Sequence, residues 1–208
     1  MDMKWSAFKL CGMHYLACIF IMILNGCKNE SNATTETSVK TQTVAETESE
    51  NAIDPSVAGM WQDYIASNPK FEGQEIPESD FFHNNRADAN RLAELTLNGK
   101  KKASSGLYSL YKYYQVALPK VGTKQIVTDF DGKAVAIIEN KRVDTIPFNQ
   151  ISEDYAGLDM GTDVEPLEKW KKAHWDFFEN FLKESGGEPN EEMLIVCVIF
   201  KTVWPAKH

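Results

Sequence analysis

The apolar positions of the chain follow a helical period in three segments. Residues 55–69, 84–99 and 165–187 each place apolar side chains three or four residues apart, as one buried face of a helix requires. An Asn-Pro pair ends the first segment, and Gly99 fits the left-handed residue that follows the end of the second. The pattern therefore predicts three amphipathic helices.

Between the second and third of these helices the period changes to that of strands. Residues 124–143 are rich in β-branched side chains on both sides of Asp131-Gly132, a pair that is common in tight hairpin turns. Residues 193–205 form an apolar run long enough for an interior strand. Helices that cluster early and late around such strands predict an α+β domain with a small barrel or curled sheet.

Residues 1–26 have the pattern of an export signal. Lys4 and Lys9 give a positive start, and they precede an apolar run that is short for a membrane span and is followed by polar sequence. The segment ends in Leu-Asn-Gly-Cys and resembles a bacterial lipobox, whose cysteine, here Cys27, receives lipid. Asn25 departs from the usual small residue, so an uncleaved anchor helix is the alternative. Both interpretations place the rest of the chain at a membrane surface outside the cytoplasm, and the first makes it an anchored lipoprotein.

Residues 27–54 predict a disordered tether, because their Thr, Ser, Glu and Asn side chains cannot bury enough surface to offset the entropy of ordering.

The chain carries a net charge of −8. The signal contributes +1 and the tether, with six acids and two lysines, contributes −4, which leaves −5 on residues 55–208. Tight binding of long duplex nucleic acid rests on neutralising phosphates, so an acidic domain disfavours it. A local basic pocket can still accept one small anionic or polar ligand.

The cysteines and histidines predict no metal site and no cofactor. Cys11 and Cys18 lie in the signal and Cys27 would carry lipid, which leaves Cys197 in the apolar run MLIVCVIF as a buried small hydrophobe. The histidines are scattered along the chain and form no ligand cluster with cysteine. His174, on the apolar side of the third helix, is expected to be a packed, hydrogen-bonded side chain.

The stretch LNGKKKASSGLYSLYKYY, residues 97–114, sets three lysines before two serines and a row of aromatic residues. Taken alone, lysines at this point are typical of a solvated helix end. The tyrosines either close one end of the barrel or stack on a base, since every base has a π face.

Gly99-Lys100-Lys101-Lys102-Ala103-Ser104 resembles the G-x-K-x-x-[ST] signature of ASCH domains. The blocks LPKVGTKQIV, AVAIIENKRVDTIPF, KWKKAHWDFF and VCVIFKTVWP follow in the order seen in the longer bacterial branch of that family. The resemblance covers roughly residues 56–205 and places an ASCH domain at 55–208. It implies a PUA-like small β-barrel with flanking helices and a pocket at one side of the barrel.

One ASCH branch resembles an amidohydrolase that removes the acetyl group from N4-acetylcytidine. Carried over, that resemblance implies catalytic roles for Lys101, Ser104 and Glu139. Ser104 stands where many members have threonine, and Lys102 where this branch often has threonine; a serine keeps the hydroxyl nucleophile. Ser104 would attack, Lys101 would accept its proton, and Glu139 would orient Lys101 or the substrate.

Four further residues are expected to contact the ligand. Lys100 and Lys102 would lower the pKa of Lys101 as neighbouring cations, and Ser105 and Tyr108 would line the pocket. A turn between Lys101 and Ser104 is required, because strand alternation alone does not place residues three apart on one face.

Three functions therefore stay open. The first is a membrane-tethered amidohydrolase of N-acylated nucleosides, and the second is a non-catalytic module that binds a nucleotide or an RNA fragment. The third is an interaction domain with a degenerate pocket. A Ser104→Ala variant separates the first two, because it should abolish turnover and leave binding largely intact.

Overall fold

The structure, a computed structural model, describes residues 53–184 and 186–206. The predicted signal, Cys27 and the tether up to residue 52 lie outside the described residues. Among the described helices, none combines the length and the apolar character needed to cross a bilayer. The described helices and strands are, in chain order, α1 (Pro55–Ser67), η1 (Pro69–Phe71), β1 (Ser79–Asp80), α2 (Arg86–Leu97), β2 (Ala103–Leu107), α3 (Tyr108–Tyr113), β3 (Lys124–Thr128), β4 (Ala134–Pro147), η2 (Phe148–Gln150), α4 (Glu153–Met160), α5 (Pro166–Glu184) and β5 (Leu194–Trp204).

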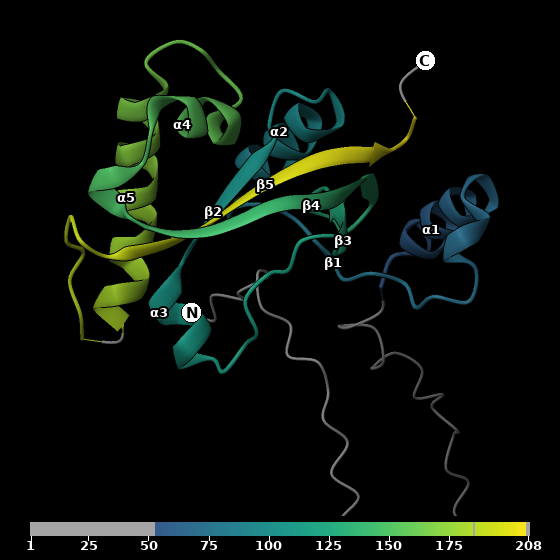
Figure 1. Cartoon of the computed structure of the whole chain (residues 1–208), viewed down its shortest axis with the longest axis horizontal. Coiled ribbons are helices and arrows are strands. Elements are labelled where there is room, and N and C mark those ends of the chain that lie inside the picture. The colour runs from purple at the N-terminus through teal and green to yellow at the C-terminus, as the bar shows by residue number, and fades with distance from the viewer. Residues whose placement is uncertain (1–52, 185, 207–208) are drawn as a thin grey trace, which may run out of the picture. The chain divides into compact units, whose positions relative to one another are not determined.

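The five described strands form one sheet in the order β1-β3-β4-β5-β2, with β1 and β2 at its edges. β1 pairs parallel with β3, and the other neighbours pair antiparallel. α4 and α5 stand at one end of the long strands β4 and β5, and α1 stands at the other end (Figure 1). This arrangement confirms the predicted α+β class.

Local sequence explains where the helices begin and end. The side chains of Asn85 and Ser152 accept hydrogen bonds from backbone N–H groups in the first turns of α2 and α4, at 2.9 and 3.2 Å. Gly99 follows α2 with φ 66°, and Gly161 follows α4 with φ 67°. Both glycines occupy the left-handed conformation that side chains with a Cβ rarely adopt.

The core consists of three clusters on the two faces of the sheet. The largest joins β2 and β5 to α4 and α5 around Trp170 and Phe178, which are 0% and 1% exposed. A second packs α1 on β3 and β4 through Trp61 and Ile137. A third brings α2 onto strands β3, β4 and β5. Cys197 lies buried in the largest cluster, as predicted.

Helix α4 covers the outer edge of β2. The backbone N–H of Lys102 donates to the carbonyl of Leu158 at 2.7 Å, and the hydroxyl of Tyr155 donates to the carbonyl of Ser104 at 2.7 Å. These bonds satisfy groups that an exposed edge strand would offer to another chain. They also hold the lysine-serine stretch against α4.

The predicted helices, hairpin and final strand are present, with two differences. The hairpin connection runs from Asp129 to Lys133 rather than over two residues, because the Asp129 side chain accepts backbone bonds from both Asp131 and Lys133 at 3.0 and 2.9 Å. The tyrosine-rich segment after β2 forms the short helix α3, which the sequence pattern did not predict.

Candidate functional site

Lys101 is buried and forms an ion pair with Asp159 at the end of α4. Lys101 is 4% exposed to solvent and Asp159 is 2% exposed. The Lys101 ammonium donates to the Asp159 carboxylate and, at 2.9 Å, to the Asp159 carbonyl. The ring of Phe82 lies on another side of the ammonium, 4.9 Å from Nζ to the ring centroid. The signature lysine is therefore enclosed by α4 and by the segment before α2.

Ser105 belongs to the same buried cluster. Its hydroxyl donates to the second carboxylate oxygen of Asp159 at 2.6 Å and lies 3.0 Å from the Tyr155 hydroxyl. The indole N–H of Trp170 reaches both Ser105 Oγ, at 3.1 Å, and Asp159, at 2.9 Å. One carboxylate thus ties β2 to α4 and α5.

His174 completes the cluster from α5. Its Nδ1 lies 2.9 Å from the Trp170 carbonyl, and its Nε2 lies 3.5 Å from the Asp159 carboxylate. The ring stacks on Trp170 with 4.3 Å between centroids. His174 is a packed, hydrogen-bonded side chain, as the sequence predicted.

This packing determines whether the pKa of each titratable group in the cluster is raised or lowered. Burial alone would raise the pKa of Asp159, but the Lys101 charge, the His174 charge and the hydrogen bonds outweigh it and hold that pKa below its ordinary value. Burial lowers the pKa of His174, which Asp159 only partly offsets. Burial and the nearby carboxylate raise the pKa of Tyr155 well above its ordinary value. The packing therefore favours the ionised form of Asp159 and the neutral form of His174.

Ser104 and Lys102 face away from that cluster. Side chains alternate along a strand, so Lys101, Ala103 and Ser105 share one face and Ser104 the other. The backbone N–H of Phe200 donates to the Lys102 carbonyl at 2.8 Å, which extends the pairing of β2 with β5 by one residue. Lys102 therefore points to the same side of the sheet as Ser104, two residues later. Lys102 is exposed and Ser104 is half-buried.

Tyr111 of α3 lies beside this second face, and Tyr108 is the first residue of α3, directly after β2. A Cβ built on Gly106, two residues after Ser104, would lie 2.8 Å from the Tyr111 hydroxyl, so the glycine allows that close approach. Tyr108 is half-buried, and the Lys112 ammonium lies 5.4 Å from the centroid of its ring. Lys102, Ser104 and Gly106 with the two tyrosines are called the β2–α3 face below.

Two predicted site residues lie elsewhere. Lys100 is exposed directly after α2. Glu139 does not orient Lys101: its ion pairs are with Lys124 at 3.2 Å and Lys141 at 2.5 Å, and β5 separates its strand from β2. The reason is the register of the sheet: Glu139 lies opposite Lys201 on β5, whereas Ser104 lies opposite Val198, three residues away along the same strand.

Sequence reasoning missed Asp159 and Phe82 as neighbours of Lys101, and Trp170 as a hydrogen-bond donor to Asp159. Asp159 stands between Leu158 and Met160, where a carboxylate in an apolar stretch signals a buried partner of opposite charge. Nothing in the sequence indicates which lysine that partner is, because the contact joins residues 58 positions apart. In the described residues, no group of three or more His, Cys, Asp or Glu side chains could hold a metal ion.

The fold and the site define an α+β domain in which a lysine-serine stretch leads into an edge strand. The chain belongs to the ASCH domain family, because the family model described as ASCH domain matches residues 78–204. No curated protein matches the chain.

Two solved structures are similar to this chain. An ASCH domain from Lactobacillus crispatus JV V101 is 32% identical, with a TM-score of 0.67, and the match covers 74% of this chain and 98% of that one. A protein from Enterococcus faecalis V583 is 28% identical, with a TM-score of 0.65, and the match covers 71% of this chain and 88% of that one.

Proposed function

We propose that this ASCH domain binds a small polar ligand with a flat, nitrogen-containing ring, such as a nucleoside or nucleotide, on the β2–α3 face. The observation that carries the proposal is that Lys102 and Ser104 share this face with Gly106, against which Tyr111 of α3 packs, while Tyr108 begins α3 directly after β2. An ammonium and a hydroxyl supply hydrogen bonds to ring and sugar oxygens, and a tyrosine ring supplies a stacking surface.

The geometry supports binding better than it supports hydrolysis through the mechanism that the family resemblance implies. The Lys101 ammonium is bonded to the buried Asp159 on the side of β2 away from Ser104, and Glu139 is paired with Lys124 and Lys141 on a different strand. Amide hydrolysis at Ser104 stays a second candidate, favoured by the half-buried hydroxyl on the same face as Lys102. In that version the base would have to be Lys102.

The test uses residues 53–208 and isothermal titration with cytidine and N4-acetylcytidine, with deacylation followed chromatographically in parallel. Tyr108→Ala should weaken binding by about tenfold, since stacking on one base is worth roughly 1–3 kcal/mol. The matched control is Ser109→Ala, because Ser109 is an exposed residue of α3. This variant should bind the nucleosides as tightly as the parent chain does.

Each outcome separates the candidates. Saturable binding without turnover, weakened in Tyr108→Ala, supports the binding module. Turnover that disappears in Ser104→Ala with binding retained supports the hydrolase. Neither binding nor turnover with both nucleosides rejects the nucleoside proposal and leaves the interaction domain.

The N-terminal segment supports a second, separate proposal, that lipid on Cys27 anchors the domain outside the cytoplasm. The apolar run that ends in Leu-Asn-Gly-Cys carries it. Expression of the full chain in a bacterial host with a labelled fatty acid should give a labelled membrane-bound product, and Cys27→Ser should remove the label. An unlabelled wild-type chain that keeps residues 1–26 in the membrane would point to the uncleaved anchor.

A further inference from the structure

Three lysines surround Glu139 on one face of the sheet. Lys124 on β3 and Lys201 on β5 are the residues directly opposite Glu139 on its two neighbouring strands. Opposite residues of antiparallel strands project to the same face, with about 4.5–5.5 Å between their Cα atoms. Lys124, Glu139 and Lys201 therefore form a row across three strands, and Lys141 lies beside its centre.

Both carboxylate oxygens of Glu139 are engaged within this row. Lys124 Nζ lies 3.2 Å from one oxygen and Lys141 Nζ lies 2.5 Å from the other. The hydrogen bond from Lys141 outweighs partial burial, and with the contacts of Lys124 it holds the pKa of Glu139 below its ordinary value. The glutamate is thus ionised at neutral pH and positions two ammonium groups.

Lys201 is the cation in the row for which the described residues show no ion pair. It is exposed, and none of the ion pairs among the described residues includes it. Three ammonium groups and one carboxylate leave a local charge of +2 in a chain whose net charge is −8. A concentrated positive charge of this kind raises the local concentration of anions.

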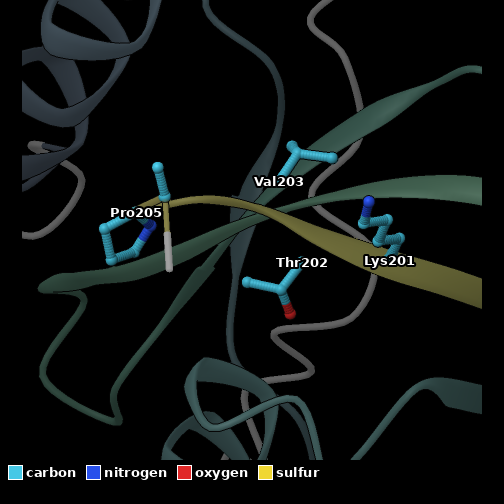
Figure 2. A pocket seen from close by; sticks show the side chains of 5 residues that line it. Lys201, Thr202, Val203 and Pro205 are labelled. Atoms are coloured by element: carbon cyan, nitrogen blue, oxygen red, sulfur yellow. The ribbon is translucent and has the colours of Figure 1, made fainter. Parts of the chain in front are cut away.

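A hollow adjoins this row. Its volume is about 320 Å³, and Lys201, Thr202, Val203, Pro205 and Ala206 line it. Figure 2 shows the side chains of Lys201 and Val203 on one side of the strand and that of Thr202 on the other. The Thr202 hydroxyl is occupied, since it donates to the Thr96 carbonyl at 2.7 Å. Lys201 is therefore the charged group beside the hollow.

The row is also pre-organised. The Lys124 side chain is only 9% exposed, and its ammonium lies between Glu139 and the ring of Phe71, 4.0 Å from the ring centroid. A lysine fixed in this way loses little side-chain entropy when an anion arrives. The Lys141 side chain is 46% exposed and can turn from the glutamate to a ligand.

We propose that Lys201, Lys141 and Lys124 form a binding site for a phosphoryl dianion at the hollow. Lys201 and Lys141 contact the phosphoryl oxygens, and Lys124 contributes its charge from behind Glu139. The same chemistry belongs to inorganic phosphate, to a small phosphate ester and to a phosphomonoester lipid headgroup. The site is independent of nucleoside binding on the β2–α3 face, because it uses none of the same residues.

The test measures phosphate binding by the full chain purified in detergent micelles, at low ionic strength. Inorganic phosphate is titrated calorimetrically, with chloride as the reference anion. Lys201→Gln should weaken phosphate binding about threefold to tenfold, because one charge contact is lost. Lys133→Gln is the matched control: it removes the same charge from an exposed residue beyond the other end of β3 and should bind like the parent.

Glu139→Gln should change the affinity for phosphate in the opposite direction to Lys201→Gln, which makes the test more specific. Removing the carboxylate raises the local charge to +3, and this gain should outweigh the lost positioning of Lys124 and Lys141, so phosphate binding should become tighter. An ordinary structural defect would weaken it. A second arm uses vesicles of phosphatidylcholine with and without phosphatidic acid. Binding that depends on Lys201 only in the vesicle arm identifies a lipid headgroup as the source. Failure to bind in both arms, equal loss in Lys201→Gln and Lys133→Gln, or weaker phosphate binding in Glu139→Gln would overturn the proposal.

Discussion

At the scale of single residues, the carboxylate of Asp159 determines the state of Lys101. It receives hydrogen bonds from Lys101, Ser105 and Trp170 in a site shielded from water. We expect Asp159→Ala to lower the free energy of unfolding by about 3–5 kcal/mol, because the substitution leaves a buried ammonium without a partner. Urea unfolding of residues 53–208 measures this change.

The control is Asp144→Ala, which removes a half-exposed carboxylate paired with Arg142. Its cost should be within about 1 kcal/mol, as for other surface ion pairs. Replacing the pair together, as Lys101→Met with Asp159→Leu, should recover much of the stability. Equal losses for Asp159→Ala and Asp144→Ala would show that water reaches Lys101 in solution.

His174 gives the cluster a dependence on pH. Its pKa is lowered in the folded state by burial, so the unfolded chain binds more protons below pH about 6.5. Stability should therefore fall as the pH drops from about 7 to 5, by at most about 1.4 kcal/mol per pH unit from this histidine. The lowered pKa of Asp159 acts in the same direction, but only at more acidic pH, from about 4 downward.

Urea unfolding at several pH values tests the role of His174. The slope between pH about 7 and 5 should become smaller in His174→Gln than in the parent chain. An unchanged slope in His174→Gln would assign the pH dependence to other groups.

At the scale of elements, the end of α4 must fit closely against the lysine stretch. Gly161 has φ 67°, and a Cβ built there would lie 3.3 Å from the Lys101 backbone nitrogen. Gly161→Ala should lower the free energy of unfolding by about 1–2 kcal/mol, because it combines left-handed backbone strain with a tight contact. Thermal unfolding compares it with Gly59→Ala, in α1 with open space around it, which should be neutral or stabilising by up to about 1 kcal/mol.

The elements also show what the sequence could predict. The periodicity of apolar residues locates α1, α2, α5 and the β3–β4 hairpin, because each buries one face that is visible as a local pattern. Short α3 has too few residues for such a pattern. The arrangement of the site depends on which residues of β2 point to the same side of the sheet, and on contacts between residues that are far apart in the sequence. Period two explains why Ser104 and Ser105 point to opposite faces, but only the fold shows that the buried face carries Asp159.

At the scale of the whole molecule, α1 is part of the folded unit although it precedes the matched family segment, residues 78–204. Its Val57, Trp61 and Tyr64 are at most 4% exposed and pack against Ile126 and Ile137 of the sheet. Removing α1 would uncover this face of the sheet.

We therefore expect a chain that begins at residue 53 to unfold at the same temperature as the full chain, and one that begins at residue 78 to unfold at a much lower temperature or to aggregate. Trp61→Ala in the longer chain isolates the packing contribution and should cost about 3–5 kcal/mol, as for other buried aromatic residues. Gln62→Ala, on the exposed side of α1, is the matched control and should change stability little. If the chain from residue 78 unfolds at the temperature of the longer one, α1 contributes nothing to the stability of the sheet, and the domain boundary belongs at the start of the family segment instead.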